Sequence, residues 1–198
     1  MQQWQPLEFF AEVCVLIARL DYAWRWLGTA FSFFMFGLGG LVLPMLVVPV
    51  LYCLPGGALT RAKRMQLAIH YLFRGFIGMM RFLGVLTYHI EGLEKLKHGR
   101  LILANHPSLL DVVFLISLVP NANCVVNGHL TRNFFTRGPI KAAGYIINEE
   151  AGDVIVAAAK AFDNGRALIV FPEGTRTTPG EAMRLKRGAA NIAVRTGS

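Results

Sequence analysis

Apolar and polar positions follow two different rhythms along this chain, and the change comes near residue 85. Before it, long apolar runs dominate, and no charged residue occurs between Trp26 and Thr60. That stretch exceeds the roughly 20 residues that cross a bilayer as a helix. Pro44 and Pro49 would kink such a helix. Two shapes therefore fit the segment: one tilted, kinked span, or a hairpin that dips into one leaflet and returns.

Two further helical patterns flank this apolar stretch. Residues 1–25 predict an amphipathic lead-in helix with tryptophans suited to a membrane interface. Residues 61–84 predict a basic amphipathic helix with Thr60 as its N-cap. A basic helix beside a membrane segment suits an anionic lipid surface and indicates the cytoplasmic side. We expect a membrane-associated helical segment over residues 1–60 and an α/β domain over residues 61–198.

From residue 85 onward, short apolar runs alternate with helical patterns. Strands are predicted over residues 85–92, 100–106, 122–128, 145–150 and 166–174, and helices over residues 108–120, 129–144 (broken near Gly138 and Pro139), 153–165 and 184–198. This alternation predicts an α/β fold, a mostly parallel sheet flanked by helices, behind the N-terminal anchoring segment. No strand follows the last helix, so we expect either that the domain continues beyond Ser198 or that it is unusually short.

Composition narrows the class of protein. The chain is 54% hydrophobic and only 16% charged, which is too apolar for a typical soluble domain, and its net charge is +8. Because the basic residues flank a membrane segment, they favour a lipid partner over nucleic acid. Neither the three cysteines nor the histidines outside residue 106 have metal-ligand spacing, so no metal site is expected. These residues are Cys14, Cys53, Cys124, His70, His89, His98 and His129.

Candidate chemistry begins at "NHPSLLD", where a predicted strand meets a helix. A histidine can take a proton from a hydroxyl, and a carboxylate bonded to the ring fixes its tautomer. A strand-to-helix turn can fold Asp111 back onto His106, with Ser108 capping the helix. Because no nucleophile stands out beside the pair, direct activation of an acceptor is favoured. Separate capping roles for the two residues are the alternative.

A second candidate loop, "FPEGTR", follows another predicted strand. Its backbone N–H groups, with Thr175 and Arg176, can hold an anionic group. Glu173 could position a hydroxyl or orient the arginine, while Gly174 shapes the turn. The alternative is a surface loop with a solvated salt bridge.

The two motifs together, in this order, resemble the lysophospholipid acyltransferase family, which includes 1-acylglycerol-3-phosphate acyltransferases. The resemblance implies a membrane-bound O-acyltransferase on the cytoplasmic face, in a bacterial inner membrane. His106 would be the general base, with Asp111 orienting it and Asn105 supporting the turn. Glu173, Gly174, Thr175 and Arg176 would bind the lysolipid head group. Acyl-CoA or acyl-carrier protein would donate the acyl chain, and no cofactor is implied.

The chain also departs from that family's pattern between the two motifs. Asn127 or Gly128 stands where a lysine is usual, and Glu149 stands where the G-x-x-x-I-x-R block has arginine. Either other cations compensate, or the acceptor is a lyso-aminolipid or another single-chain lipid with a zwitterionic or amino head group. The candidate compensating cations are Arg132, Arg137 and Lys141. Lys186 and Arg187 are interpreted either as exposed charges at a helix start or as contacts to a donor phosphate or the membrane surface. A lipid-binding protein without catalysis and a thioester hydrolase remain alternative functions.

Overall fold

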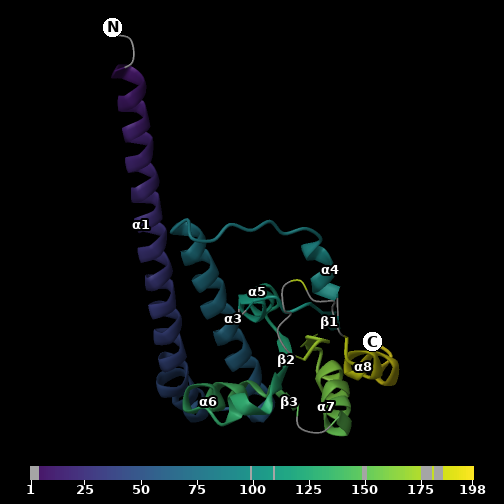
Figure 1. Cartoon of the computed structure of the whole chain (residues 1–198). Coiled ribbons are helices and arrows are strands. Elements are labelled where there is room, and N and C mark those ends of the chain that lie inside the picture. The colour runs from purple at the N-terminus through teal and green to yellow at the C-terminus, as the bar shows by residue number, and fades with distance from the viewer. Residues whose placement is uncertain (1–4, 99, 109, 149–150, 175–179, 181–184) are drawn as a thin grey trace.

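In a computed structural model, the chain is described over residues 5–98, 100–108, 110–148, 151–174, 180 and 185–198. A long N-terminal helical arm precedes a parallel sheet with helices on both faces (Figure 1). The helices are α1 (Gln5–Val42), α2 (Val48–Cys53), α3 (Ala58–Phe82), α4 (Leu93–His98), α5 (Leu110–Leu118), α6 (Phe134–Ala143), α7 (Ala151–Asp163) and α8 (Gly188–Thr196), with a π turn η1 (Leu43–Val47) and a 3₁₀ turn η2 (Gly128–Thr131).

The described strands form one sheet in the order β1-β4-β2-β3, and every pairing is parallel. The strands are β1 (Leu101–Leu103), β2 (Ala122–Asn127), β3 (Ile146–Asn148) and β4 (Ala167–Val170). Each strand is followed by a helix, as parallel connections require. The α/β fold with a mostly parallel sheet is therefore confirmed.

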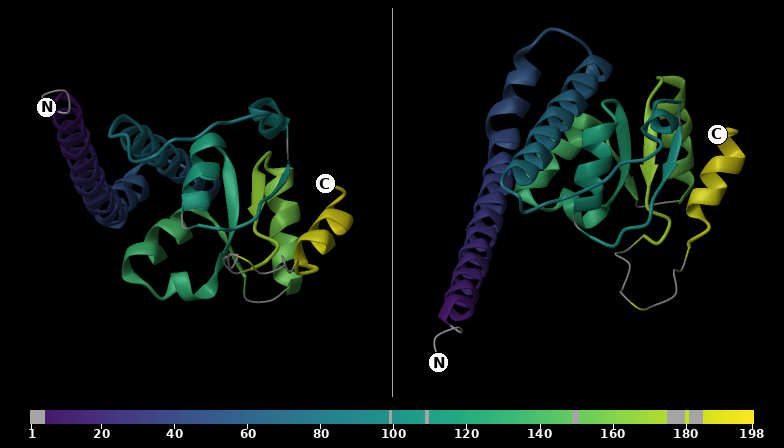
Figure 2. Two further views of the ribbon diagram at one scale, coloured as in Figure 1. Left: turned by 45° about the horizontal axis from the view of Figure 1, so that its top comes forward. Right: turned by 90° about the horizontal axis from the view of Figure 1, so that it is seen from above.

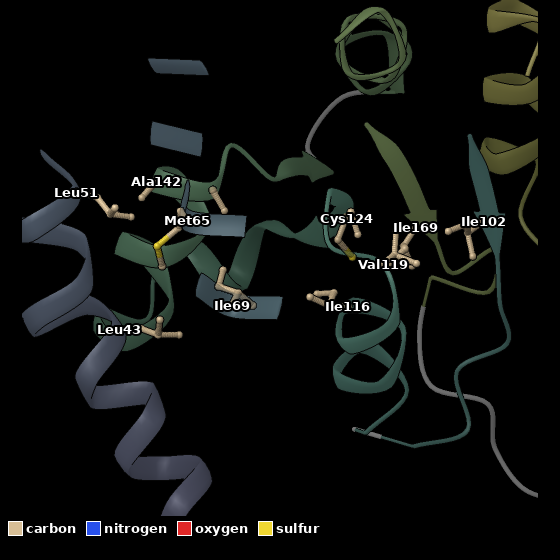
Figure 3. Close-up of a cluster of buried hydrophobic side chains, with 12 residues drawn as sticks. Leu43, Leu51, Met65, Ile69, Ile102, Ile116, Val119, Cys124, Ala142 and Ile169 are labelled. Carbon is tan, nitrogen blue, oxygen red and sulfur yellow. The ribbon is translucent and has the colours of Figure 1, made fainter. Parts of the chain in front are cut away.

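Alternating residues of β4 serve two separate cores. Ile169 packs into a cluster with Met65 and Ile69 of α3 and Ile116 of α5 (Figure 3). Leu168 and Val170 face the other way, into a cluster with α7 and α8. Figure 2 shows the sheet between these two groups of helices. The central strand is buried on both faces, which explains its continuous apolar sequence.

The N-terminal segment is one helical run rather than a lead-in helix and a separate hairpin. It continues from α1 through η1 into α2 and turns only after Cys53. Residues Phe10–Cys53 are long and apolar enough to cross a membrane by length and composition. Pro44 lies in η1 and Pro49 near the start of α2, so the prolines change the helical hydrogen bonding locally without reversing the chain.

Three sequence predictions are wrong in detail. Residues 85–92 form no strand in the described structure, although they alternate in hydrophobicity. Within this segment the Tyr88 ring packs edge-on against Phe114 of α5, with ring centroids 5.1 Å apart. Thr60 does not cap the basic helix, because α3 already begins at Ala58 with Gly57 as N-cap.

The third wrong prediction is a helix break near Gly138 and Pro139. Helix α6 runs through both residues. Proline normally disfavours a helical residue before it through a clash with that residue's Cβ, which Gly138 lacks. The N-cap of the helix is Asn133, whose side chain accepts a hydrogen bond from the Phe135 N–H, and its C-cap is Gly144 in the left-handed region.

Arg166, directly before β4, is a buried charge. It is 8% exposed, and its Nε and Nη2 have no hydrogen-bond partner in the described part of the chain. Burial lowers the pKa of this guanidinium. A buried donor without a partner costs free energy, because water no longer solvates it.

We predict that Arg166→Met raises the free energy of unfolding by about 1–3 kcal/mol, because it keeps the apolar stem and removes the unpaired donors. Thermal unfolding in detergent micelles measures the change. The exposed Arg195 of α8 provides the control, and Arg195→Met is expected to stay within about 0.5 kcal/mol. A lower melting temperature for Arg166→Met would contradict the prediction.

Candidate active site

The pairing of β1 with β4 brings the two candidate motifs together. Leu103 is in register with Val170 at the carboxyl ends of these neighbouring strands, and the Ala104 N–H donates to the Val170 carbonyl at 3.3 Å. "NHPSLLD" leaves β1 and "FPEG" leaves β4 at the same edge of the sheet. The carboxyl edge of a parallel sheet is the usual place for a binding site.

His106 and Asp111 form the expected pair. Nδ1 of His106 lies 3.1 Å from Oδ2 of Asp111, and the two side chains are 18% and 22% exposed. A carboxylate can only accept, so Nδ1 carries the proton in this bond. The lone pair of the neutral ring is then on Nε2. This is the tautomer that a general base acting through Nε2 requires.

Asp111 is also part of a capping box at the start of α5. Its Oδ2 accepts from the Ser108 N–H at 2.6 Å, and its Oδ1 accepts from the Ser108 hydroxyl at 2.8 Å. The Ser108 hydroxyl oxygen in turn accepts from the Leu110 N–H at 3.2 Å. Ser108 thus donates to both carboxylate oxygens and holds the carboxylate at a fixed position. The local capping role and the pairing with His106 therefore coexist in one side chain.

We predict that Ser108→Ala lowers the free energy of unfolding by about 1 kcal/mol, the typical loss for a removed N-cap. Thermal unfolding measures it. Ser108→Thr keeps a hydroxyl and should stay closer to the unaltered protein, so equal losses for both variants would show that the capping bonds do not stabilise the turn.

The His106 ring is supported from the second motif. It stacks on Phe171 with centroids 4.4 Å apart and an interplanar angle of 27°. The backbone N–H of His106 donates to Oε1 of Glu173 at 3.4 Å, and Glu173 is buried. The second motif thus fixes both the ring and the backbone of the first. This direct support of the histidine was not anticipated from the sequence.

The remaining predicted site residues are Asn105, Gly174, Thr175 and Arg176, and the structure describes the first two of them. The Asn105 side chain is exposed, with no hydrogen bond to another described residue. Gly174 lies at φ +70° and lets the chain turn tightly, with its N–H donating to the Phe171 carbonyl at 3.0 Å. Thr175 and Arg176 lie outside the described residues, as does Glu149. Among the described residues, no three His, Cys, Asp or Glu side chains gather as a metal site requires.

A cavity of about 390 Å³ opens beside His106 at this edge of the sheet. A second, almost wholly apolar groove of about 250 Å³ lies between α1, α3 and α6. Both are lined by Val112, Val126 and Leu130, so the cavity and the groove are neighbours that share these three side chains as a wall. Arg132, Arg137 and Lys141, the expected compensating cations, line neither of them.

Cys124 also lines the cavity beside His106. Burial raises the pKa of its thiol to about 12, so the thiol stays protonated at neutral pH. A protonated thiol is a poor nucleophile. A cysteine nucleophile at this position is therefore disfavoured.

The fold and the two joined motifs define an acyltransferase-type α/β domain. Residues 87–198, more than half of the chain, match the family model named Acyltransferase, and the chain belongs to this family. It is 30% identical over 138 residues to a Caenorhabditis elegans protein described as a 1-acyl-sn-glycerol-3-phosphate acyltransferase (acl-2), covering 63% of this chain and 47% of that protein.

A 1-acyl-sn-glycerol-3-phosphate acyltransferase of Helicobacter pylori is 37% identical over 120 residues, which is 57% of this chain and 51% of that enzyme. The chain thus spans about half the length of these two relatives. The crystal structure of the 1-acyl-sn-glycerophosphate (LPA) acyltransferase PlsC from Thermotoga maritima has the same fold. The TM-score is 0.65 at 20% identity, covering 87% of this chain and 72% of PlsC.

Proposed function

We propose that this protein transfers an acyl chain from a thioester to the hydroxyl of a lysolipid, with lysophosphatidate as acceptor. The observation that carries the proposal is the His106–Asp111 pair, held at the rim of the sheet beside a cavity that shares a wall with an apolar groove. The names of the two similar proteins support the same acceptor. The family membership supports acyl transfer as the reaction.

In the proposed reaction, Nε2 of His106 takes the proton from the acceptor hydroxyl as its oxygen attacks the thioester carbonyl. The imidazolium that forms is stabilised by the Asp111 carboxylate at Nδ1. The tetrahedral intermediate collapses, the carbon–sulfur bond breaks, and the leaving thiolate takes the proton back from Nε2. An ester and a free thiol result, and no acyl group is attached to the protein.

The apolar groove is the proposed site for a hydrocarbon chain. Its walls include Phe36 and Gly39 of α1 and Leu72 of α3, and it shares Val126 with the cavity. Burial of each methylene contributes about 0.8 kcal/mol. An acyl chain lying in this groove would place its thioester carbonyl in the cavity beside His106.

The proposed location of the reaction is the cytoplasmic surface of a membrane, expected to be a bacterial inner membrane. The helical run Phe10–Cys53 is the candidate anchor, and most of its large apolar side chains are exposed. The basic residues of α3 suit anionic head groups. Acyl-CoA or acyl-carrier protein is the proposed donor, because both present a thioester from the aqueous side.

We predict that His106→Ala lowers acyl transfer by about 10²–10⁴-fold, because the hydroxyl loses its base. Labelled acyl donor and lysophosphatidate are incubated with the purified protein, and the lipid products are separated. His89, whose Nε2 lies 3.4 Å from an exposed Glu91, provides the control, and His89→Ala should keep full activity.

The product pattern separates the alternative functions. A hydrolase would release free fatty acid whether or not acceptor is present, and a lipid-binding protein would give no turnover in any variant. Equal rates of acyl transfer by His106→Ala and the unaltered protein would contradict the proposed mechanism. Retained thermal unfolding behaviour in His106→Ala checks that the variant is folded.

We predict that Val126→Phe lowers kcat/KM for long-chain acyl donors about tenfold or more and has less effect on short-chain donors. The larger side chain would take up space at the wall shared by groove and cavity and cost a long chain several buried methylenes. Val156→Phe, at an exposed position of α7 that lines neither space, is the control. Equal losses for all chain lengths would place the acyl chain elsewhere.

A further inference from the structure

Lys186 is exposed just before α8, as its sequence position suggested, and its side chain lies across the turn that follows β4. Its backbone N–H donates to the Pro172 carbonyl at 2.8 Å, which folds the segment before α8 back onto the motif. A Cβ added at Gly174 would lie 2.8 Å from Nζ of Lys186 and 3.2 Å from its Cε. The lysine side chain therefore occupies the space that the glycine leaves open.

The cavity beside His106 has one permanent cation among its described lining residues, and it is Lys186. Asn127 and Asn148, at the carboxyl ends of β2 and β3, contribute uncharged polar groups. No carboxylate belongs to the described lining, and Oε1 of Glu173 accepts from the backbone N–H of His106. A phosphate entering this cavity would meet attraction from Lys186 and no described acidic wall.

We propose that Lys186 binds the phosphate of the acceptor in the cavity beside His106 and so selects phosphate-bearing lysolipids. This inference rests on the proposed acyl transfer and names the head-group contact for it. Lys186 takes the electrostatic place of the cations that the chain lacks at Asn127, Gly128 and Glu149. An ammonium can bind a phosphate as a point charge from a flexible stem, so no fixed fork geometry is needed.

Distance favours the acceptor phosphate over a phosphate of the donor. A cavity of about 390 Å³ corresponds to a sphere only about 9 Å across, and both His106 and Lys186 line it. In lysophosphatidate, four bonds separate the reacting oxygen from phosphorus, so both groups fit in that space. In a phosphopantetheine thioester, about thirteen bonds of roughly 1.5 Å separate sulfur from phosphorus, which places an extended arm's phosphate well outside.

The test compares Lys186→Ala, Lys186→Arg and the unaltered protein, with KM measured separately for lysophosphatidate and for the acyl donor. Lys186→Ala should raise KM for lysophosphatidate about 10- to 100-fold, the expected loss for one charge-assisted hydrogen bond. The KM of the donor should stay unchanged, and Lys186→Arg should recover most of the loss. The matched control is Arg187→Ala, because Arg187 is exposed and does not line the cavity.

A binding measurement gives a second readout that needs no turnover. Glycerol 3-phosphate, the head group without its chain, should raise the melting temperature of the unaltered protein and of Arg187→Ala, but not of Lys186→Ala. An unchanged KM for lysophosphatidate in Lys186→Ala, or a raised KM for the donor instead, would overturn the inference while leaving acyl transfer intact. Absence of any acyl transfer by the unaltered protein would overturn the proposed function itself.

Discussion

The parallel pairing of β1 with β4 is the constraint on which the site depends. It joins two loops that are linked by a hydrogen bond from the backbone N–H of His106 to Glu173, residues 67 positions apart. Both loops hold the imidazole. The first supplies the His106 ring and the Asp111 carboxylate, and the second supplies Phe171, which stacks on the ring, and Glu173, which accepts the hydrogen bond from the His106 backbone. A shift of one residue in this register would turn Ile169 and Leu168 toward the wrong cores, so packing fixes the site.

Asp111 shows how one side chain can satisfy a structural and a chemical requirement at once. The capping box fixes both carboxylate oxygens through Ser108, and Oδ2 still accepts from Nδ1 of His106. An aspartate used only for capping would leave Nδ1 of the histidine without this carboxylate to fix its tautomer. An aspartate used only for the histidine would need another group to hold it. The spacing of five residues meets both needs because the helix begins between them.

Much of the fold and the His106–Asp111 pair could be predicted from the local pattern of apolar and polar residues. Strand and helix alternation gave the parallel sheet, and the spacing of His106 and Asp111 gave the pair. The same reasoning was wrong at two places. Residues 85–92 alternate in hydrophobicity but lie outside the described sheet, with Tyr88 packed on Phe114. Pro139 is accommodated in α6, where the preceding Gly138 has no Cβ to clash with it. Lys186 joins the cavity through a backbone bond to Pro172, a contact that only the folded chain creates.

The N-terminal helix and the cavity cannot be treated as independent parts. Phe36 and Gly39 of α1 and Leu72 of α3 form walls of the groove that shares Val126 with the cavity. A Cβ at Gly39 would lie 3.3 Å from a methyl carbon of Leu72, so the two helices already approach closely there. The helix that is apolar enough for a membrane thus shapes the groove as well. Any tilt of α1 against α3 would change the groove's width, which couples the position of the anchor to the space available for a lipid chain.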